Sequence, residues 1–250
     1  MIATLSGLMD SPSTEKMFKK GLEKSQSGLL LVYVAFLSVA GYVYHVIAGQ
    51  AFSSLLTLSA VFQCLAFSLL GVQIIGSDSV AGISAKSLLL DAFALASRLV
   101  ATVFEVSYVP FDQTGDWIYQ AIDGLSLAMI FWILYRVFVE QRSTYEADED
   151  AFPALPLALG SLGLAAVFHA NLNRDKFYDT LWMCGVFASA ISVLPQLWMM
   201  AHRSGKSSAL TSHFVAVMAV ARVVSGAYMW HAYPEISADP LFGNTKYAGY

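Results

Sequence analysis

Long apolar runs separated by short polar segments dominate the pattern of hydrophobic and polar positions along the chain. Most of the runs are about 20 residues long, which is the length that an α-helix needs to cross the hydrocarbon core of a bilayer. The pattern therefore predicts an all-α polytopic membrane protein with about seven transmembrane helices. The predicted spans are residues 27–48, 51–75, 87–109, 117–139, 154–168, 180–200 and 208–230.

The composition supports this class of protein. Of the 250 residues, 57% are hydrophobic and 13% are charged, whereas about a quarter of a soluble domain is charged. Cys64 and Cys184 both lie inside apolar runs, so we expect them to be small packing residues and not a disulfide. The chain contains no nucleotide-binding loop, zinc-ligand pattern or nucleophile elbow. We therefore expect no enzymatic activity, no metal, no cofactor and no nucleic-acid partner.

The distribution of lysine and arginine predicts the orientation in the bilayer. Residues 1–26 form a polar head that carries four lysines. When the seven spans alternate in direction, nine basic residues lie on the side of this head and three on the other side. The excess of basic residues marks the cytosolic side, so we expect the head to be cytosolic. The acidic loop that contains Glu146, Asp148, Glu149 and Asp150 is interpreted as a solvated loop.

Several ionisable residues lie inside the predicted spans, where charge is costly and usually functional. Asp91, Arg98 and Glu105 are seven residues apart, so they occupy nearly one face of the third helix. This face suits either a water-filled cavity or internal ion pairs of Arg98 with Asp91 or Glu105. Arg222 lies in the middle of the last span, and His231 at its outer end is either an interfacial histidine or a pH-sensitive group. We expect Arg98 and Arg222 to face the interior of the bundle.

Four short stretches share their order and spacing with motifs of one family of membrane proteins. VAGISAKS (80–87) resembles the motif CAGISGKS, and STYEADEDAF (143–152) resembles ATYDGNHDTF. SVLPQL (192–197) resembles AILPQL, and SGKSSALTSHF (204–214) resembles TGEAETITTHY. These are motifs of the ER lumen protein-retaining receptors, the KDEL receptor family. The resemblance identifies residues 51–235 as a KDEL-receptor-like helical bundle.

The resemblance implies an architecture of two three-helix bundles, as in the PQ-loop and SWEET transporters. Residues 27–50 then form an additional N-terminal transmembrane helix ahead of the family's first helix. The family's own N-terminus is luminal, so the additional helix places residues 1–26 in the cytosol and makes residues 236–250 a polar luminal segment. The family's last helix has no counterpart before Tyr250, so either the sequence is a fragment or that helix is absent.

The resemblance also implies a site for the C-terminal retrieval tetrapeptide of a luminal protein. Arg98 matches the family arginine that holds the peptide carboxylate, and the guanidinium fork suits this role because it forms two parallel hydrogen bonds to a carboxylate. Arg222 matches an arginine of the polar network around the ligand. The other expected ligand-binding residues are Asp91, Glu105 and His231. The expected cytosolic sorting residues are Lys86, Arg203 and Lys206.

Most of the family's specificity residues are replaced in this chain. Ser189 stands where the family has the glutamate that meets the ligand lysine, and Gln63 stands where it has an early histidine. A tail lysine should therefore not be strongly favoured at its peptide position. The remaining replacements are Leu99 for a tyrosine, Ala101 for an acidic residue, Ala221 for a tyrosine, and Ala232 or His231 for an arginine.

The resulting hypothesis is a receptor-like protein of the endoplasmic reticulum and Golgi membranes. Its expected partners are the C-terminal tails of luminal proteins, the cytosolic retrograde coat and the lipid bilayer. By resemblance, a luminal-facing cavity takes the tail at Golgi pH, protonation tightens the site, and the cytosolic side recruits the coat. Two alternatives remain open: a small-solute transporter of the PQ-loop type, and a structural subunit of a larger membrane complex.

Overall fold

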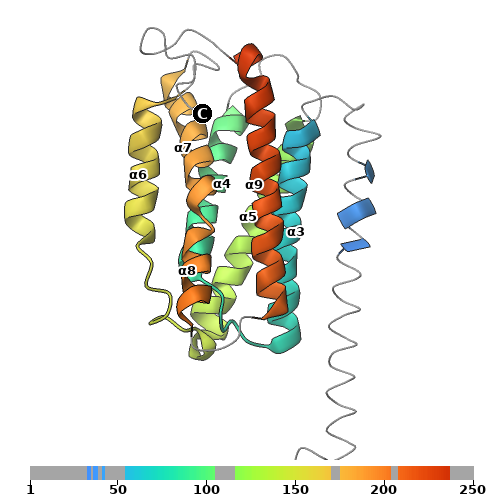
Figure 1. The fold of residues 1–250 in the computed structure, drawn as a ribbon, viewed down its shortest axis with the longest axis vertical. Coiled ribbons are helices and arrows are strands. Elements are labelled where there is room, and N and C mark those ends of the chain that lie inside the picture. The colour runs from blue at the N-terminus through green and yellow to red at the C-terminus, as the bar shows by residue number, and fades with distance from the viewer. Residues whose placement is uncertain are drawn as a thin grey trace, which may run out of the picture.

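The described part of the chain is an upright bundle of helices (Figure 1). The computed structural model describes residues 33–34, 36–38, 41–42, 54–104, 116–169, 175–203 and 208–236. No strand occurs among these residues, which confirms the prediction of an all-α protein. The α-helices are α3 (Ser54–Ser77), α4 (Ala85–Phe104), α5 (Asp116–Tyr135), α6 (Ala154–Val167), α7 (Lys176–Ile191), α8 (Leu194–His202) and α9 (Ala209–Ile236). A π-helical turn, η2 (Arg136–Glu140), and a 3-10 turn, η3 (Arg142–Thr144), follow α5.

Five segments of the described chain are long and apolar enough to cross a membrane. They contain α3, α4, α5, α7 with α8, and α9, so the polytopic membrane class is confirmed. Helix α6 has 14 residues, which makes it about 21 Å long at 1.5 Å per residue, against a hydrocarbon core of roughly 30 Å. The predicted span 27–48 lies mostly outside the described residues. The number of seven spans therefore stays a prediction.

The predicted span 180–200 is a pair of helices and not one continuous helix. Helix α7 ends at Ile191, and α8 begins at Leu194. Pro195 lies in the first turn of α8, where its missing N–H costs no helical hydrogen bond. Both parts are apolar, so a hydropathy pattern alone cannot separate them.

The long helices pack as neighbours from distant parts of the sequence. Helix α3 lies between α5 and α9, and α4 lies between α5 and α7. Helix α6 packs on the outer side of α7 (Figure 1). Helix α9 packs chiefly against α3, and α7 chiefly against α4. The division into two three-helix bundles, which the resemblance implied, stays a prediction.

Two apolar cores fill the bundle at its two ends. The first contains Phe67, Ile130 and Phe214, and the second contains Tyr119 and Trp182 together with further residues of α3, α4 and α9. Buried or half-buried polar residues of α3, α4, α5 and α9 and of the break between α7 and α8 occupy the positions between these two cores. The polar residues of this layer are Gln63, Asp91, Arg98, Asp123, Ser126, Ser192 and Arg222.

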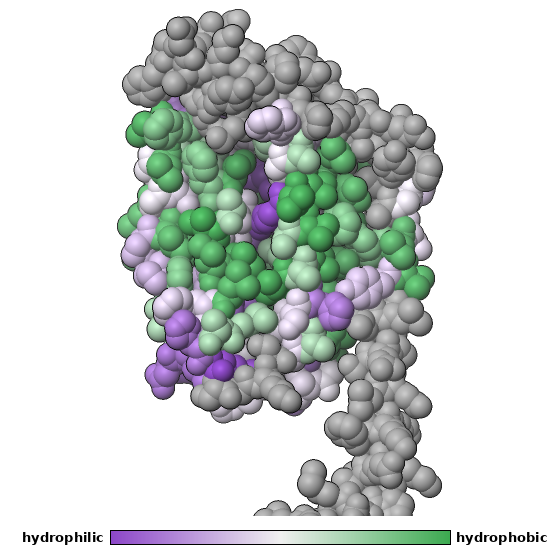
Figure 2. All heavy atoms as spheres, in the orientation of Figure 1, coloured by the Kyte–Doolittle hydropathy of each residue, from purple (hydrophilic) through white to green (hydrophobic). Residues whose placement is uncertain are grey.

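The outer surface of the bundle is apolar over most of its height. Figure 2 shows a broad apolar band over the described helices and hydrophilic residues gathered at one end. Exposed leucine, valine and aromatic side chains make up this band, as expected for helices that face lipid. Examples are Leu125, Phe131, Leu159, Leu164 and Val223.

A network of polar contacts joins the loops at the hydrophilic end, and we call Gly82, Ser84, Asp150, Gln196 and Arg203 the turn network. The Gln196 side chain accepts from Ser84 N at 2.8 Å and donates to Gly82 O at 2.9 Å. Gly82 has φ = +78°, and a Cβ there would lie 2.5 Å from Arg203 Nη1. The positive φ therefore favours glycine, and a side chain there would also displace the end of the Arg203 side chain. The turns at 80–87 and 192–197, two of the resemblance motifs, are thus in direct contact.

The acidic loop is part of this network, so its interpretation as a solvated loop is wrong for Asp150, whereas Asp148 is exposed. Asp150 is fully buried, accepts from Ser84 Oγ at 2.7 Å and from Lys86 N at 3.1 Å, and also accepts from Tyr145. Burial and the hydrogen bond to Asp150 raise the pKa of Tyr145, so its hydroxyl stays a donor throughout the physiological range. Glu146 is ion-paired with Arg203 at 2.8 Å. A run of acidic residues in a loop does not reveal partners such as Ser84, Lys86 and Arg203, because these come from other parts of the chain.

We expect Gln196→Met to destabilise the protein by about 1–3 kcal/mol, because it leaves the buried Gly82 O and Ser84 N without their side-chain partner. Gln120→Met is the matched control, since Gln120 is half-buried and, among the described residues, makes one hydrogen bond, to Thr102 O at 2.9 Å. Thermal unfolding of both variants in detergent measures the difference. Equal stability of the two variants would contradict the assigned role of Gln196.

Candidate functional site

Arg98 and Asp123 form a buried bidentate ion pair between α4 and α5. Arg98 Nε donates to Asp123 Oδ2 at 2.7 Å, and Arg98 Nη2 donates to Asp123 Oδ1 at 2.7 Å. The carboxylate is fully buried, and 9% of the Arg98 side chain is exposed. The guanidinium also lies over the Tyr119 ring, 5.2 Å from its centroid. Two short parallel hydrogen bonds in a low-dielectric interior make this a strong and directional contact.

Arg222 of α9 is held by a second set of polar groups. Its Nη1 donates to Gln63 Oε1 at 2.7 Å, and its Nη2 donates to Asp91 Oδ1 at 3.0 Å. Arg222 Nη2 also lies 3.4 Å from Ser192 Oγ. These contacts link α9 with α3, α4 and the break between α7 and α8. Both guanidinium groups therefore lie inside the bundle, as the cost of exposing them to lipid predicted.

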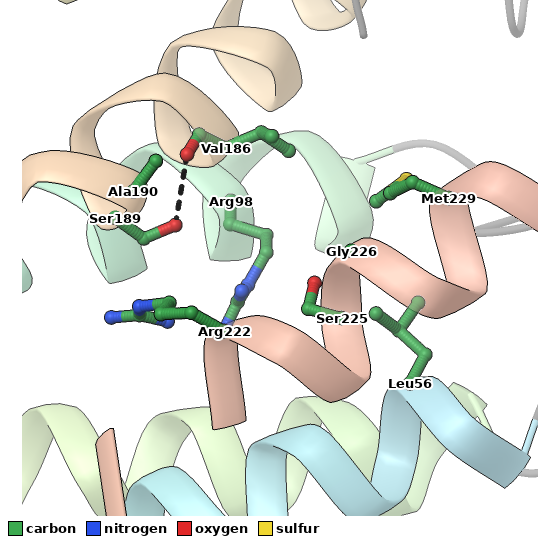
Figure 3. Close-up of a pocket in the computed structure, with 9 residues that line it drawn as sticks. All are labelled: Leu56, Arg98, Val186, Ser189, Ala190, Arg222, Ser225, Gly226 and Met229. Carbon is green, nitrogen blue, oxygen red and sulfur yellow. Dashed lines mark hydrogen bonds between the residues drawn. The ribbon is translucent and has the colours of Figure 1, made fainter. Parts of the chain in front are cut away.

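The two arginines line one cavity of about 130 Å³. Figure 3 shows that the Arg98 side chain extends from α4 towards Arg222 of α9. Ser189 of α7 also lines this cavity. In Figure 2 a hydrophilic recess is visible between the apolar surfaces of α7 and α9. The remaining lining residues are Leu56, Val186, Ala190, Ser225, Gly226 and Met229.

Three atoms around Arg222 have no hydrogen-bond partner among the described residues. They are Gln63 Nε2, Asp91 Oδ2 and Arg222 Nε. Two of them are donors and one is a charged acceptor, and a buried group without a partner costs about 1–3 kcal/mol. This part of the polar layer therefore has capacity for water or for polar groups of a ligand.

The structure brings together three of the five predicted ligand-site residues: Asp91, Arg98 and Arg222. It corrects the suggested ion pair of Arg98 with Asp91, because Arg98 pairs with Asp123 while Asp91 pairs with Arg222. The suggested pair of Arg98 with Glu105 stays a prediction. The spacing placed Asp91 and Arg98 on one face but could not show which other helices supply their partners. Glu105 lies outside the described residues. His231 lies in α9, but its side chain also lies outside the described part.

Asp123 is the site residue that sequence reasoning missed. It lies inside the predicted span 117–139, seven residues from the start of α5. The argument that selected Arg222, a charge inside an apolar span, applies equally to Asp123. An aspartate inside an apolar span was therefore a sufficient signal to predict that Asp123 belongs to the site.

Of the replaced specificity positions, Ser189 lines the cavity and Gln63 contacts Arg222, which also lines it. Ser189 is in the cavity wall, and its hydroxyl donates to Val186 O at 3.1 Å (Figure 3). Gln63 is one of the partners of Arg222. Ala101 and Ala221 are buried and apolar. The cavity wall thus offers a hydroxyl, and not an anion, at the Ser189 position.

Two of the three predicted sorting residues, Lys86 and Arg203, lie at the hydrophilic end of the bundle, away from the cavity. Arg203 is ion-paired with Glu146 at 2.8 Å, and its Nε lies 3.7 Å from Glu149. The backbone N–H of Lys86 donates to Asp150 at 3.1 Å. Lys206 lies outside the described residues. Cys64 and Cys184 are free thiols inside the bundle, which confirms that they form no disulfide.

Comparison with known proteins gives a consistent result. Residues 79–231 match the family described as ER lumen protein retaining receptor. The chain is 26% identical over 185 residues to ER lumen protein-retaining receptor 3 of Xenopus laevis, which covers 74% of this chain and 81% of that protein. It is 28% identical over 180 residues to ER lumen protein-retaining receptor erd-2.2 of Caenorhabditis elegans, covering 71% and 78%. It is 25% identical over 159 residues to ER lumen protein-retaining receptor 2 of Danio rerio, covering 64% and 69%.

Proposed function

Because this chain belongs to the ER lumen protein retaining receptor family, we propose that it binds C-terminal retrieval signals of luminal proteins. It is an integral membrane protein of the endoplasmic reticulum and Golgi, and it returns its ligands by retrograde vesicle transport. A receptor of this kind carries out no chemical step on its ligand. The observation that supports binding most directly is the cavity lined by two arginines in the middle of an apolar bundle.

The chemistry of the cavity suits a peptide that ends in a free carboxylate. Arg98 and Arg222 supply guanidinium groups from opposite walls, and guanidinium forms strong charge-assisted hydrogen bonds with carboxylates. Leu56, Val186 and Met229 supply apolar wall surface beside them. This combination fits an apolar C-terminal residue such as leucine, whose side chain and carboxylate need different surroundings.

The proposed orientation places the cavity on the luminal side. With residues 1–26 in the cytosol, α3 begins at the luminal end and α4 ends there. Leu56 lies in the first turn of α3, and Arg98 lies in the second half of α4. The turn network is then cytosolic. In this orientation the cavity is accessible to luminal tails, and the turn network faces the cytosolic coat.

Among the three proposed sorting residues, Lys86 and Lys206 are the better candidates for coat binding. Arg203 already pairs with Glu146 and Glu149, and 16% of its side chain is exposed. Binding an acidic partner through Arg203 would require breaking these contacts. Its proposed role is therefore to fix the acidic loop beside the turn that contains Gly82.

Peptide binding by the full chain tests the proposed function. A fluorescent tetrapeptide ending in Lys-Asp-Glu-Leu is titrated against the purified protein in detergent, at mildly acid and at neutral pH. We expect saturable binding that is tighter at acid pH and is displaced by unlabelled tail. A tail extended by one glycine beyond the leucine is the control. Absence of binding at both pH values would leave the transporter and structural hypotheses.

We expect Ser189→Glu to create a preference for a lysine in the tail. The substitution places a carboxylate in the cavity wall, where a tail lysine can pair with it. A buried charged hydrogen bond contributes about 1.5–3 kcal/mol, so the Kd ratio of Ala-Asp-Glu-Leu to Lys-Asp-Glu-Leu tails should rise about tenfold or more. Ser189→Gln, which is neutral and of similar size, should leave this ratio unchanged. An equal effect of both substitutions would show that the residue does not meet the lysine.

A further inference from the structure

The geometry of the Arg98–Asp123 pair determines what a ligand meets in the cavity. A guanidinium group has two edges that can each hold a carboxylate, one formed by Nε with Nη2 and one by Nη1 with Nη2. Asp123 occupies the first of these edges through two hydrogen bonds of 2.7 Å. It does so from α5, a helix that contributes no residue to the cavity lining.

Asp123 also changes the charge of the site. Its carboxylate is fully buried, so water screens it little, and its negative charge offsets the positive charge of Arg98. Asp91, which is 1% exposed, does the same for Arg222 through a single oxygen at 3.0 Å. The cavity therefore presents two ion pairs to a ligand, and not two isolated cations. The Arg98–Asp123 pair is the more complete of the two, because both carboxylate oxygens of Asp123 accept hydrogen bonds from Arg98.

We propose that Asp123 is a specificity-determining residue that lowers the affinity of the cavity for ligand carboxylates by occupying and neutralising Arg98. This inference rests on the proposed function and adds a residue that sets the affinity for the ligand carboxylate. An incoming carboxylate must share Arg98 with Asp123 or displace it from the Nε edge. The site therefore selects tails whose other contacts compensate for this competition, and it discriminates against simple anions.

The test compares two matched variants of the full chain. Asp123→Asn removes the charge but keeps an oxygen that can accept from Arg98. Asp150→Asn makes the same change at an equally buried aspartate in the turn network, away from the cavity. The probes are the Lys-Asp-Glu-Leu tail with a free carboxylate and the same tail with an amidated C-terminus.

We expect Asp123→Asn to bind the free-carboxylate tail about tenfold more tightly than the wild type, a difference of about 1.4 kcal/mol. Its affinity for the amidated tail should change little, and Asp150→Asn should behave like the wild type towards both tails. Equal or weaker binding of the free-carboxylate tail by Asp123→Asn overturns the proposal. An equal gain for both tails also overturns it.

The proposal and the proposed function fail in different ways. If neither the wild type nor Asp123→Asn binds any tail, both fail. If the wild type binds and Asp123→Asn gains nothing, only the role of Asp123 fails. Should Asp123→Asn not fold, difference infrared spectra of wild-type protein labelled with 13C-aspartate provide a second measurement. Saturation with unlabelled tail should shift an aspartate carboxylate band, and an unchanged spectrum overturns the proposal.

Discussion

Replacing Arg98 by methionine is expected to destabilise the protein by about 3–5 kcal/mol, because the substitution leaves the Asp123 carboxylate buried and without its cation. The cost exceeds the loss of two hydrogen bonds, since a fully buried carboxylate is poorly solvated. The contact of the guanidinium with the Tyr119 ring is lost as well. Chemical or thermal unfolding in detergent, with helix content as the signal, measures the change.

A second substitution separates the buried charge from other effects of the first. In the double variant Arg98→Met/Asp123→Val both charges are absent, and an apolar pair in place of a buried ion pair is often neutral. We therefore expect the double variant to regain most of the stability that Arg98→Met loses. If the double variant is as unstable as the single variant, the isolated carboxylate is not the cause.

Substitution of Gly185 by alanine should be the other large effect, although it adds a single methyl group. A Cβ at Gly185 would lie 2.8 Å from Ala94 O and 3.2 Å from Arg98 Cβ, so α4 and α7 would have to separate. Overpacking of this kind costs about 1–3 kcal/mol. Because the neighbour is Arg98 itself, we also expect weaker binding of the retrieval tail.

Gly163→Ala is the matched control for this substitution. Gly163 lies in α6, and a Cβ there would meet nothing within 4 Å. Alanine is the better helix former by about 1 kcal/mol, so this variant should be as stable as the wild type or more stable. Equal stability of Gly185→Ala and Gly163→Ala would contradict the close packing of α4 against α7.

Much of the fold could be predicted from the apolar pattern, because lipid-facing helices require long apolar runs and charged residues fall between them. The same pattern placed Arg98 and Arg222 in the interior, since a charge inside a span must avoid lipid. The pattern could not show which residues form hydrogen bonds or ion pairs with these two arginines. The residues that pair with Arg98 and Arg222 come from α5, α4 and α3, and a helical spacing describes one helix only.

Two other differences concern the acidic loop and the break between α7 and α8. We interpreted the acidic loop as solvated because it contains four acids within five residues, whereas Asp150 accepts hydrogen bonds from Ser84 and Lys86 of a different segment. The break between α7 and α8 was hidden because both halves are apolar, and only Pro195 marked it. Tertiary contacts decided the outcome for Asp150, whereas the helix break is a local feature that hydropathy does not report.

Site-specific photocrosslinking tests the central claim most directly, namely that a retrieval tail binds between Arg98 and Arg222. A photoreactive phenylalanine analogue is placed at Ser225, which lines the cavity, or at Leu159, which is exposed on the outer surface of α6. The proposed site predicts that a labelled Lys-Asp-Glu-Leu tail crosslinks to position 225 and not to position 159. Unlabelled tail should abolish the crosslink, and amidated tail should not. Equal labelling of both positions, or competition by amidated tail as strong as by free tail, would contradict the account.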